Sequence, residues 1–145
     1  MTLLEQAIIF RQAFDQEIKE GFCPDGFIKQ SLYKMQARLI EEEVCEFDEA
    51  ATLLQYSPND LSLQREVLKE LSDVVFVCYQ FAAAFGLDLD TAMDRVYESN
   101  MSKLGEDGKP IYREDGKVLK GPFYKKPKLD DLITISHRTY DTSGK

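Results

Sequence analysis

The chain has 145 residues, the usual size of one domain, and its 43% share of hydrophobic residues is enough for a packed core and excludes a disordered chain. The net charge of −8 argues against a nucleic-acid-binding surface. No apolar stretch reaches the length of a membrane-spanning helix, so no membrane partner is expected. The three cysteines are odd in number and lack C-x-x-C spacing, so we expect a cytoplasmic protein without disulfides.

The first half of the chain carries two runs of hydrophobic residues at helical spacing. The first run predicts a helix from about residue 3 to 19, and the glycines and proline of segment 21–26 end it. The second run predicts a long helix over residues 28–55. The turn-forming segment 56–60 follows, which allows the next helix to run back along this one.

Two further helices are predicted after this turn. Asp60 or Ser62 can cap the third helix, which extends to Phe85, and a fourth helix covers about residues 88–104. We therefore predict one all-α domain over residues 1–130, a four-to-five-helix bundle. Its second and third helices are expected to form an antiparallel hairpin.

The segment after the fourth helix differs in composition. Residues 103–128 carry eight basic and four acidic groups, whereas residues 1–102 carry eight basic and 19 acidic ones. The tetrapeptide Glu-Asp-Gly-Lys occurs at 106–109 and again at 114–117, and such Asp-Gly steps beside short extended runs predict a small hairpin or a folded loop. Residues 131–145 are expected to form a flexible tail.

Four acidic residues of the predicted hairpin stand out by their positions. Glu43 and Glu46 fall in the stripe of the second helix that otherwise carries hydrophobic residues. Glu70 does the same in the third helix, and Asp73 lies one turn further along, on the neighbouring flank. Glu46 and Glu70 are equally far along the chain from Pro58 in the turn, and so are the other two acids. An antiparallel hairpin therefore places all four at matching heights.

A carboxylate that is buried without a partner is costly, and we find no cation at the stripe positions to pair with four acids. Divalent ions would relieve this repulsion. Every candidate ligand is an oxygen, and the only histidine, His137, lies in the predicted tail. Magnesium, with manganese as a substitute, is therefore favoured over zinc or iron. An isolated E-x-x-E or E-x-x-D on a helix is usually a solvated face, so the argument depends on the mirrored placement.

Three polar residues near the basic segment are candidates for binding phosphate. Asn100 and Lys103 lie one turn apart at the end of the fourth helix and either form a donor pair or merely suit a helix C-terminus. The acid cluster favours the donor pair. Lys120, beside a Gly-Pro step, can close over a phosphate chain or serve as a solubilising charge, and both interpretations remain open.

The acids resemble the E-E-x-x-E…E-x-x-D signature of the all-alpha nucleoside triphosphate pyrophosphohydrolase superfamily, with the two parts at residues 42–46 and 70–73. This superfamily includes the MazG-like proteins, the dimeric dUTPases and phosphoribosyl-ATP pyrophosphohydrolase, and the resemblance covers about residues 28–104. It implies a magnesium-dependent enzyme that cuts a nucleoside triphosphate into a monophosphate and pyrophosphate. It also implies a homodimer or homotetramer.

The resemblance also implies roles for individual residues. Magnesium would be held by the four acids described above, and Glu42 would orient or deprotonate the attacking water. Asn100 and Lys103 would hold phosphates. A magnesium-activated water would attack the α-phosphorus while Lys103 and further magnesium neutralise the departing pyrophosphate.

Three alternatives are weighed against this function. An oxygen-activating di-metal bundle normally uses helical histidines, which the predicted helices lack. A non-catalytic helical dimerisation module would need neither metal nor triphosphate. Within the superfamily, phosphoribosyl-ATP is the alternative substrate.

Overall fold

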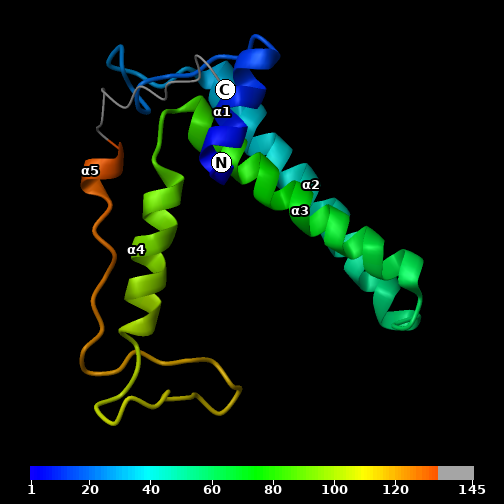
Figure 1. Ribbon diagram of the computed structural model, residues 1–145, viewed down its shortest axis with the longest axis vertical. Helices are drawn as coiled ribbons and strands as arrows, with labels where there is room; N and C mark the ends of the chain where they lie inside the picture. Colours follow the sequence, from blue (N-terminus) through cyan, green and yellow to red (C-terminus); the bar gives the residue numbers. More distant parts are fainter. Residues whose placement is uncertain (134–145) are drawn as a thin grey trace.

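The computed structural model describes residues 1–133 and is all-α, which confirms the predicted fold class (Figure 1). The rest of the predicted tail, residues 134–145, lies outside the described residues. Within the described part there are five helices, namely α1 (Leu3–Ala13), α2 (Gln30–Tyr56), α3 (Leu61–Ala84), α4 (Leu89–Met101) and α5 (Asp130–Ile133).

The long helices α2 and α3 form the predicted antiparallel hairpin (Figure 1). Asp60 caps α3, because its Oδ1 accepts hydrogen bonds from the N–H groups of Ser62 at 2.9 Å and Leu63 at 3.3 Å. The turn is further closed by Gln64, whose side-chain amide donates to the carbonyl oxygen of Pro58 at 2.8 Å. Local capping thus determines where the chain reverses.

The stripe predicted for α3 is confirmed, whereas the one predicted for α2 is partly wrong. Glu70, Val77 and other stripe residues of α3 are buried or half-buried. On α2, however, three predicted stripe residues, Met35, Glu46 and Leu53, are exposed, and Gln36 beside Met35 is buried. Along most of its length α2 packs on α3 alone, so only a narrow strip of its surface is covered.

Helix α1 ends at Ala13, six residues earlier than predicted. The chain beyond it is held by tertiary hydrogen bonds instead of helical ones. The backbone N–H of Lys19 donates to the carbonyl oxygen of Ala84 at 2.7 Å and so satisfies the C-terminal end of α3. The buried Arg11 side chain donates through Nε to the carbonyl oxygen of Glu17 at 2.8 Å and holds the same segment from the other side.

The hydrophobic core lies at one end of the hairpin, where α1 packs against the C-terminal half of α3. One cluster of this core joins the two helices and consists of Leu4, Ala7, Ile8, Tyr79, Ala82 and Ala83. A second cluster beside it gathers Leu32, Ala84 and Phe85, with Phe22 and Phe81 packed against them. Among the described residues, no third helix packs against the distal part of the hairpin (Figure 1).

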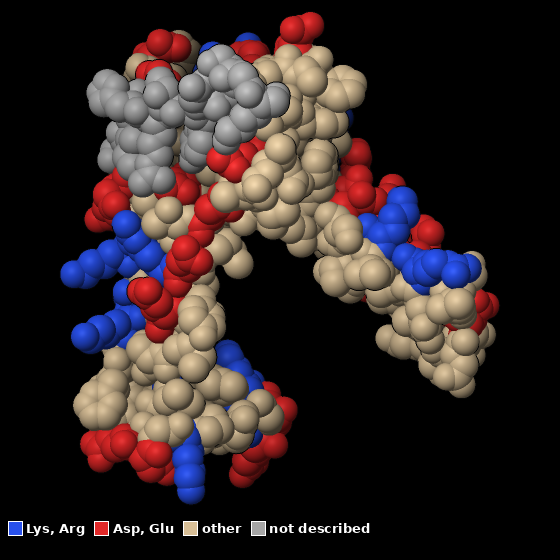
Figure 2. Space-filling view, in the orientation of Figure 1, with Lys and Arg blue, Asp and Glu red and all other residues tan. Residues whose placement is uncertain are grey.

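Helix α4 leaves α3 at a bend of 117° and runs away from the hairpin (Figure 1). The molecule therefore has two arms, which we call the hairpin arm (α2 and α3) and the α4 arm (α4 with residues 102–129). Space-filling atoms leave the space between them open (Figure 2). Among the described residues no single helix is long and apolar enough to cross a membrane, and α3 with α4 meets that criterion only as this bent pair.

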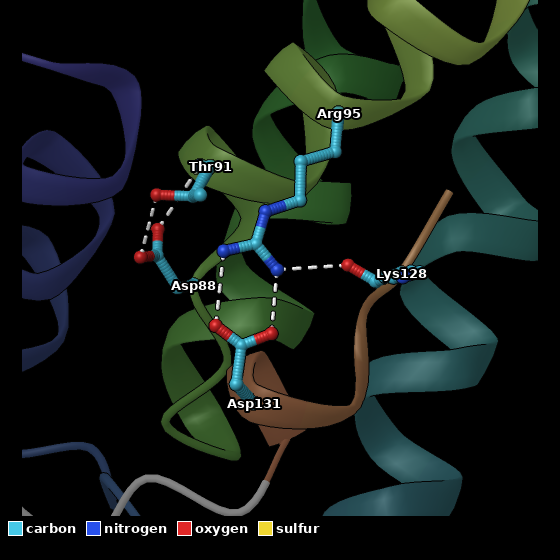
Figure 3. Close-up of polar contacts among 5 residues, drawn as sticks. All are labelled: Asp88, Thr91, Arg95, Lys128 and Asp131. Atoms are coloured by element: carbon cyan, nitrogen blue, oxygen red, sulfur yellow. Dashed lines mark hydrogen bonds and ion pairs between the residues drawn. The ribbon is translucent and has the colours of Figure 1, made fainter.

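Residues 125–131 run back along α4 and are held to it by hydrogen bonds and an ion pair (Figure 1 and Figure 3). Arg95 forms a bidentate ion pair with Asp131, at 2.5 and 2.9 Å, and donates to the carbonyl oxygen of Lys128 at 2.8 Å. Ser99, one turn further, donates to the carbonyl oxygen of Lys125 at 2.7 Å. Because these bonds hold residues 125–131 along α4, the loop before them, residues 102–124, lies at the C-terminal end of α4 (Figure 1).

The loop itself contains the predicted hairpin-like segment. Tyr112 and Val118 form an isolated antiparallel bridge, and the N–H of Leu119 donates to the carbonyl oxygen of Ile111 at 2.7 Å. The tight turn between them centres on the second Asp-Gly step, where Gly116 adopts a φ of +88° that favours glycine.

Candidate metal and phosphate site

Three of the four predicted metal ligands lie together between α2 and α3. Ligand oxygens of Glu43, Glu46 and Glu70 lie within 4.8 Å of one another. The first two come from neighbouring turns of α2 and the third from α3, so the antiparallel hairpin itself brings them together. We call these three residues the glutamate cluster.

Asp73, the fourth predicted ligand, lies one turn along α3 from Glu70 and is half-buried. It is not one of the three residues whose oxygens converge. Its charge nevertheless acts on the cluster, because it contributes to raising the pKa of Glu43. Asp73 therefore lies at the edge of the cluster.

Two oxygens of the glutamate cluster are buried and lack a hydrogen-bond partner among the described residues. They are Oε2 of Glu43 and Oε2 of Glu70. Glu70 as a whole is only 5% exposed. Buried polar atoms are nearly always satisfied in folded proteins. Carboxylate oxygens that converge without a partner fit a hard divalent cation such as magnesium.

The electrostatics of the cluster point the same way. Burial raises the pKa of Glu43, and the negative charges of Glu46 and Asp73 raise it further. The pKa of Glu70 is lowered, chiefly by its hydrogen bond with Lys69. The cluster therefore carries more negative charge than its own surroundings neutralise, and a bound cation would offset it.

The prediction concerned cations at the stripe positions alone, and a lysine outside the stripe pairs with two of the acids. Lys69 Nζ lies 3.1 Å from Oε1 of Glu70 and 3.1 Å from Oδ2 of Asp73. Lys69 is on the solvent-exposed flank of α3, outside the stripe, but its long side chain carries the charge back to the acids. An examination of the stripe positions alone misses such a residue.

Two other polar residues near the cluster were also missed. Glu66 lies one turn before Glu70 on the same side of α3, and its i, i+4 spacing was the available signal. Gln36 is buried, and its Oε1 has no partner within residues 1–133. It precedes Glu43 by two helical turns on the same face. Glu42, the predicted water-orienting residue, is exposed in the same turn of α2 as Glu43.

The predicted phosphate-binding residues lie at the far end of the α4 arm. Asn100 is exposed and Lys103 is half-buried. The loop brings Lys120 near them, because the N–H of Gly121 donates to the carbonyl oxygen of Lys103 at 2.9 Å. Lys120 Nζ lies 4.7 Å from the centre of the Tyr124 ring. Within one chain these residues and the glutamate cluster are on different arms (Figure 1).

Replacing Gly121 by alanine should loosen this arrangement. An added Cβ would lie 2.5 Å from the carbonyl oxygen of Leu104 and 2.7 Å from that of Lys103, closer than side chains tolerate. We expect Gly121→Ala to cost about 1–3 kcal/mol locally and to remove amide-exchange protection at Gly121 and Tyr124. Pro122→Ala, beside it, is the control. Unchanged protection in Gly121→Ala would contradict the close contact.

Comparison with known proteins bears on the same residues. A family model described as phosphoribosyl-ATP pyrophosphohydrolase matches residues 8–100, more than half of the chain. The chain belongs to this family. It is therefore a member of the all-alpha nucleoside triphosphate pyrophosphohydrolase superfamily, as the motifs predicted, and its activity is of the pyrophosphohydrolase class. A comparison with curated proteins found no match.

The family match runs from α1 to the last turn of α4. It thus includes the glutamate cluster, Asp73 and Asn100 of this pyrophosphohydrolase. Lys103 and Lys120 lie beyond the matched residues, and the argument for them depends on the structure of the α4 arm alone.

Proposed function

We propose that the protein is a magnesium-dependent pyrophosphohydrolase that cleaves a nucleoside triphosphate, with ribose or deoxyribose, into a nucleoside monophosphate and pyrophosphate. The observation that carries this proposal is the glutamate cluster with its two unpartnered buried oxygens. Membership in a pyrophosphohydrolase family supports the reaction class. Manganese, which accepts the same oxygen ligands, would substitute for magnesium.

In this proposal Glu43, Glu46 and Glu70 hold the cation. Asp73, at the edge of the cluster, adds a fourth carboxylate near it. The bound cation would supply Lewis-acid polarisation and charge neutralisation at the phosphates. Glu42 lies exposed in the adjoining position and is placed to orient a water molecule and accept its proton.

The phosphate chain is held by the residues of the α4 arm. Asn100 and Lys103 donate hydrogen bonds to phosphate oxygens, and Lys120 adds a second positive charge nearby. These charges offset the negative charge that develops on the departing pyrophosphate.

Phosphoribosyl-ATP is a second candidate substrate, and the description of the matched family favours it. Its hydrolysis also releases pyrophosphate from a triphosphate chain. The two candidates therefore share the glutamate cluster and the phosphate-binding residues, and they differ only in the nucleoside that the protein accepts.

A pyrophosphate-release screen with magnesium tests both candidates. Canonical and modified nucleoside triphosphates and phosphoribosyl-ATP are offered in turn, and the nucleotide product is identified by mass. We expect pyrophosphate from at least one of them, loss of the reaction with a chelator, and its recovery with magnesium or manganese. If none releases pyrophosphate, the protein is better described as a non-catalytic helical module.

We further propose that the active form is a homo-oligomer, a dimer or a tetramer, in which the α4 arm of one copy lies against the hairpin arm of another. Both arms expose large hydrophobic side chains, among them Leu53, Leu68, Leu71 and Phe76 on the hairpin arm and Met93, Tyr97 and Met101 on α4. The side of the hairpin arm that faces the open space is largely uncharged (Figure 2). Such surfaces are typical of interfaces between subunits.

This assembly would also complete the site. The candidate phosphate ligands and the glutamate cluster lie on different arms of one chain, and these arms separate at the bend between α3 and α4. In the proposed assembly, Asn100 and Lys103 of a second copy lie at the glutamate cluster of the first.

A further inference from the structure

Lys69 lies at the edge of the glutamate cluster and contacts two of the four predicted ligands. Its Nζ is 3.1 Å from Glu70 and 3.1 Å from Asp73. The lysine side chain is 61% exposed, whereas that of Glu70 is 7% exposed. The ammonium group thus reaches a buried acid from the solvent side, on a stem that can move away without disturbing the core.

The lysine neutralises only one side of the cluster. It binds Oε1 of Glu70, while Oε2 of the same carboxylate is buried and has no partner among the described residues. The same holds for Oε2 of Glu43. The acids therefore offer oxygens to a second cation even while Lys69 is in place.

A divalent ion and this ammonium group would compete. An oxygen lone pair that accepts a hydrogen bond from Lys69 cannot also coordinate a metal, and two cations a few ångströms apart repel each other. If Glu70 and Asp73 both coordinate the ion, the lysine has to release at least part of its contacts.

We propose that Lys69 is a built-in counter-charge that holds Glu70 and Asp73 in the metal-free protein and withdraws when a divalent ion binds, so that it weakens and thereby sets the affinity for that ion. This inference rests on the proposed function, which makes these acids metal ligands. Lys69 is a positioning residue here, since it acts through Glu70 and Asp73 and touches no substrate.

The test measures Mn²⁺ binding by electron paramagnetic resonance and Mg²⁺ binding by calorimetry in the full chain. Lys69→Met keeps the length of the side chain and removes its charge. We expect it to lower the Kd for both ions about tenfold, because the competing cation is gone. Lys69→Arg should stay within about threefold of the wild type. Arg65→Met, one turn earlier on the same helix, makes the same change in net charge at an exposed position and should have a smaller effect.

A second measurement needs no ion. Thermal unfolding of the metal-free protein should occur at a lower temperature in Lys69→Met than in the wild type, since two neighbouring acids lose their counter-charge. Saturating Mg²⁺ should then raise the unfolding temperature of this variant more than that of the wild type.

The outcomes separate this inference from the proposed function. If the wild type binds Mn²⁺ and Lys69→Met binds it no more tightly, Lys69 forms only a surface ion pair and the inference fails alone. An equal effect of Arg65→Met would show long-range electrostatics and overturn the direct competition. If the wild type binds neither ion, the inference and the proposed metal site both fail.

Discussion

Glu43→Gln is expected to reduce pyrophosphate release by about a thousandfold or more while leaving the helices intact. The substitution keeps the shape of the side chain but removes the charge of a cluster oxygen that is buried and unpartnered. A neutral amide is a poor ligand for a hard cation, so both binding of the ion and turnover should be lost. Steady-state kinetics and circular dichroism measure the two effects separately.

The same variant should be more stable than the wild type when no metal is present. Burial raises the pKa of Glu43 above its ordinary value of 4.5. Between pH 4.5 and this raised pKa, Glu43 holds its proton more strongly in the folded protein than in the unfolded chain. The free energy of unfolding therefore falls as the pH rises through this interval. Because glutamine is neutral throughout, we expect this variant to gain stability at pH 7 and to lose that gain below about pH 4.5, where Glu43 is protonated in both states.

Glu49→Gln is the matched control, because Glu49 lies on the exposed face of the same helix. It changes the net charge equally and should affect neither turnover nor stability appreciably. Turnover retained in Glu43→Gln would show that Glu43 is not a metal ligand. A loss of helicity would instead make it a residue that the fold requires.

Mixing two inactive variants should restore activity if the site is shared between copies. One variant carries Glu43→Gln on the hairpin arm, and the other carries Lys103→Ala on the α4 arm. After subunits exchange, about a quarter of the sites combine an intact glutamate cluster with an intact Lys103 from the other copy. We therefore expect about a quarter of the wild-type activity from a mixture whose components each have almost none.

A mixture of Glu43→Gln with Glu70→Gln is the control. Both changes are in the glutamate cluster, so every hybrid site keeps one defect and no activity should return. If the first mixture also stays inactive although light scattering shows exchanged oligomers, the site forms within one chain. A monomer at assay concentrations would likewise contradict the shared site.

The sequence by itself determined the helical hairpin and the positions of its four acidic residues along the hairpin axis. Helical spacing defines α2 and α3, Asp60 caps the second of them, and the turn around Pro58 sets their register. These features depend on hydrogen bonds and periodicity within a few residues, so they can be read without knowing what the helices pack against. The convergence of Glu43, Glu46 and Glu70 follows directly.

Features that depend on distant partners were decided by the tertiary structure. Helix α1 stops at Ala13, and beyond it the N–H of Lys19 satisfies a carbonyl at the end of α3 instead of one in its own helix. The direction of α4, and with it the separation of Lys103 from the glutamate cluster, arises at the bend after α3. Each of these features depends on contacts between residues far apart along the chain, and a pattern within a few residues does not show which of these contacts form.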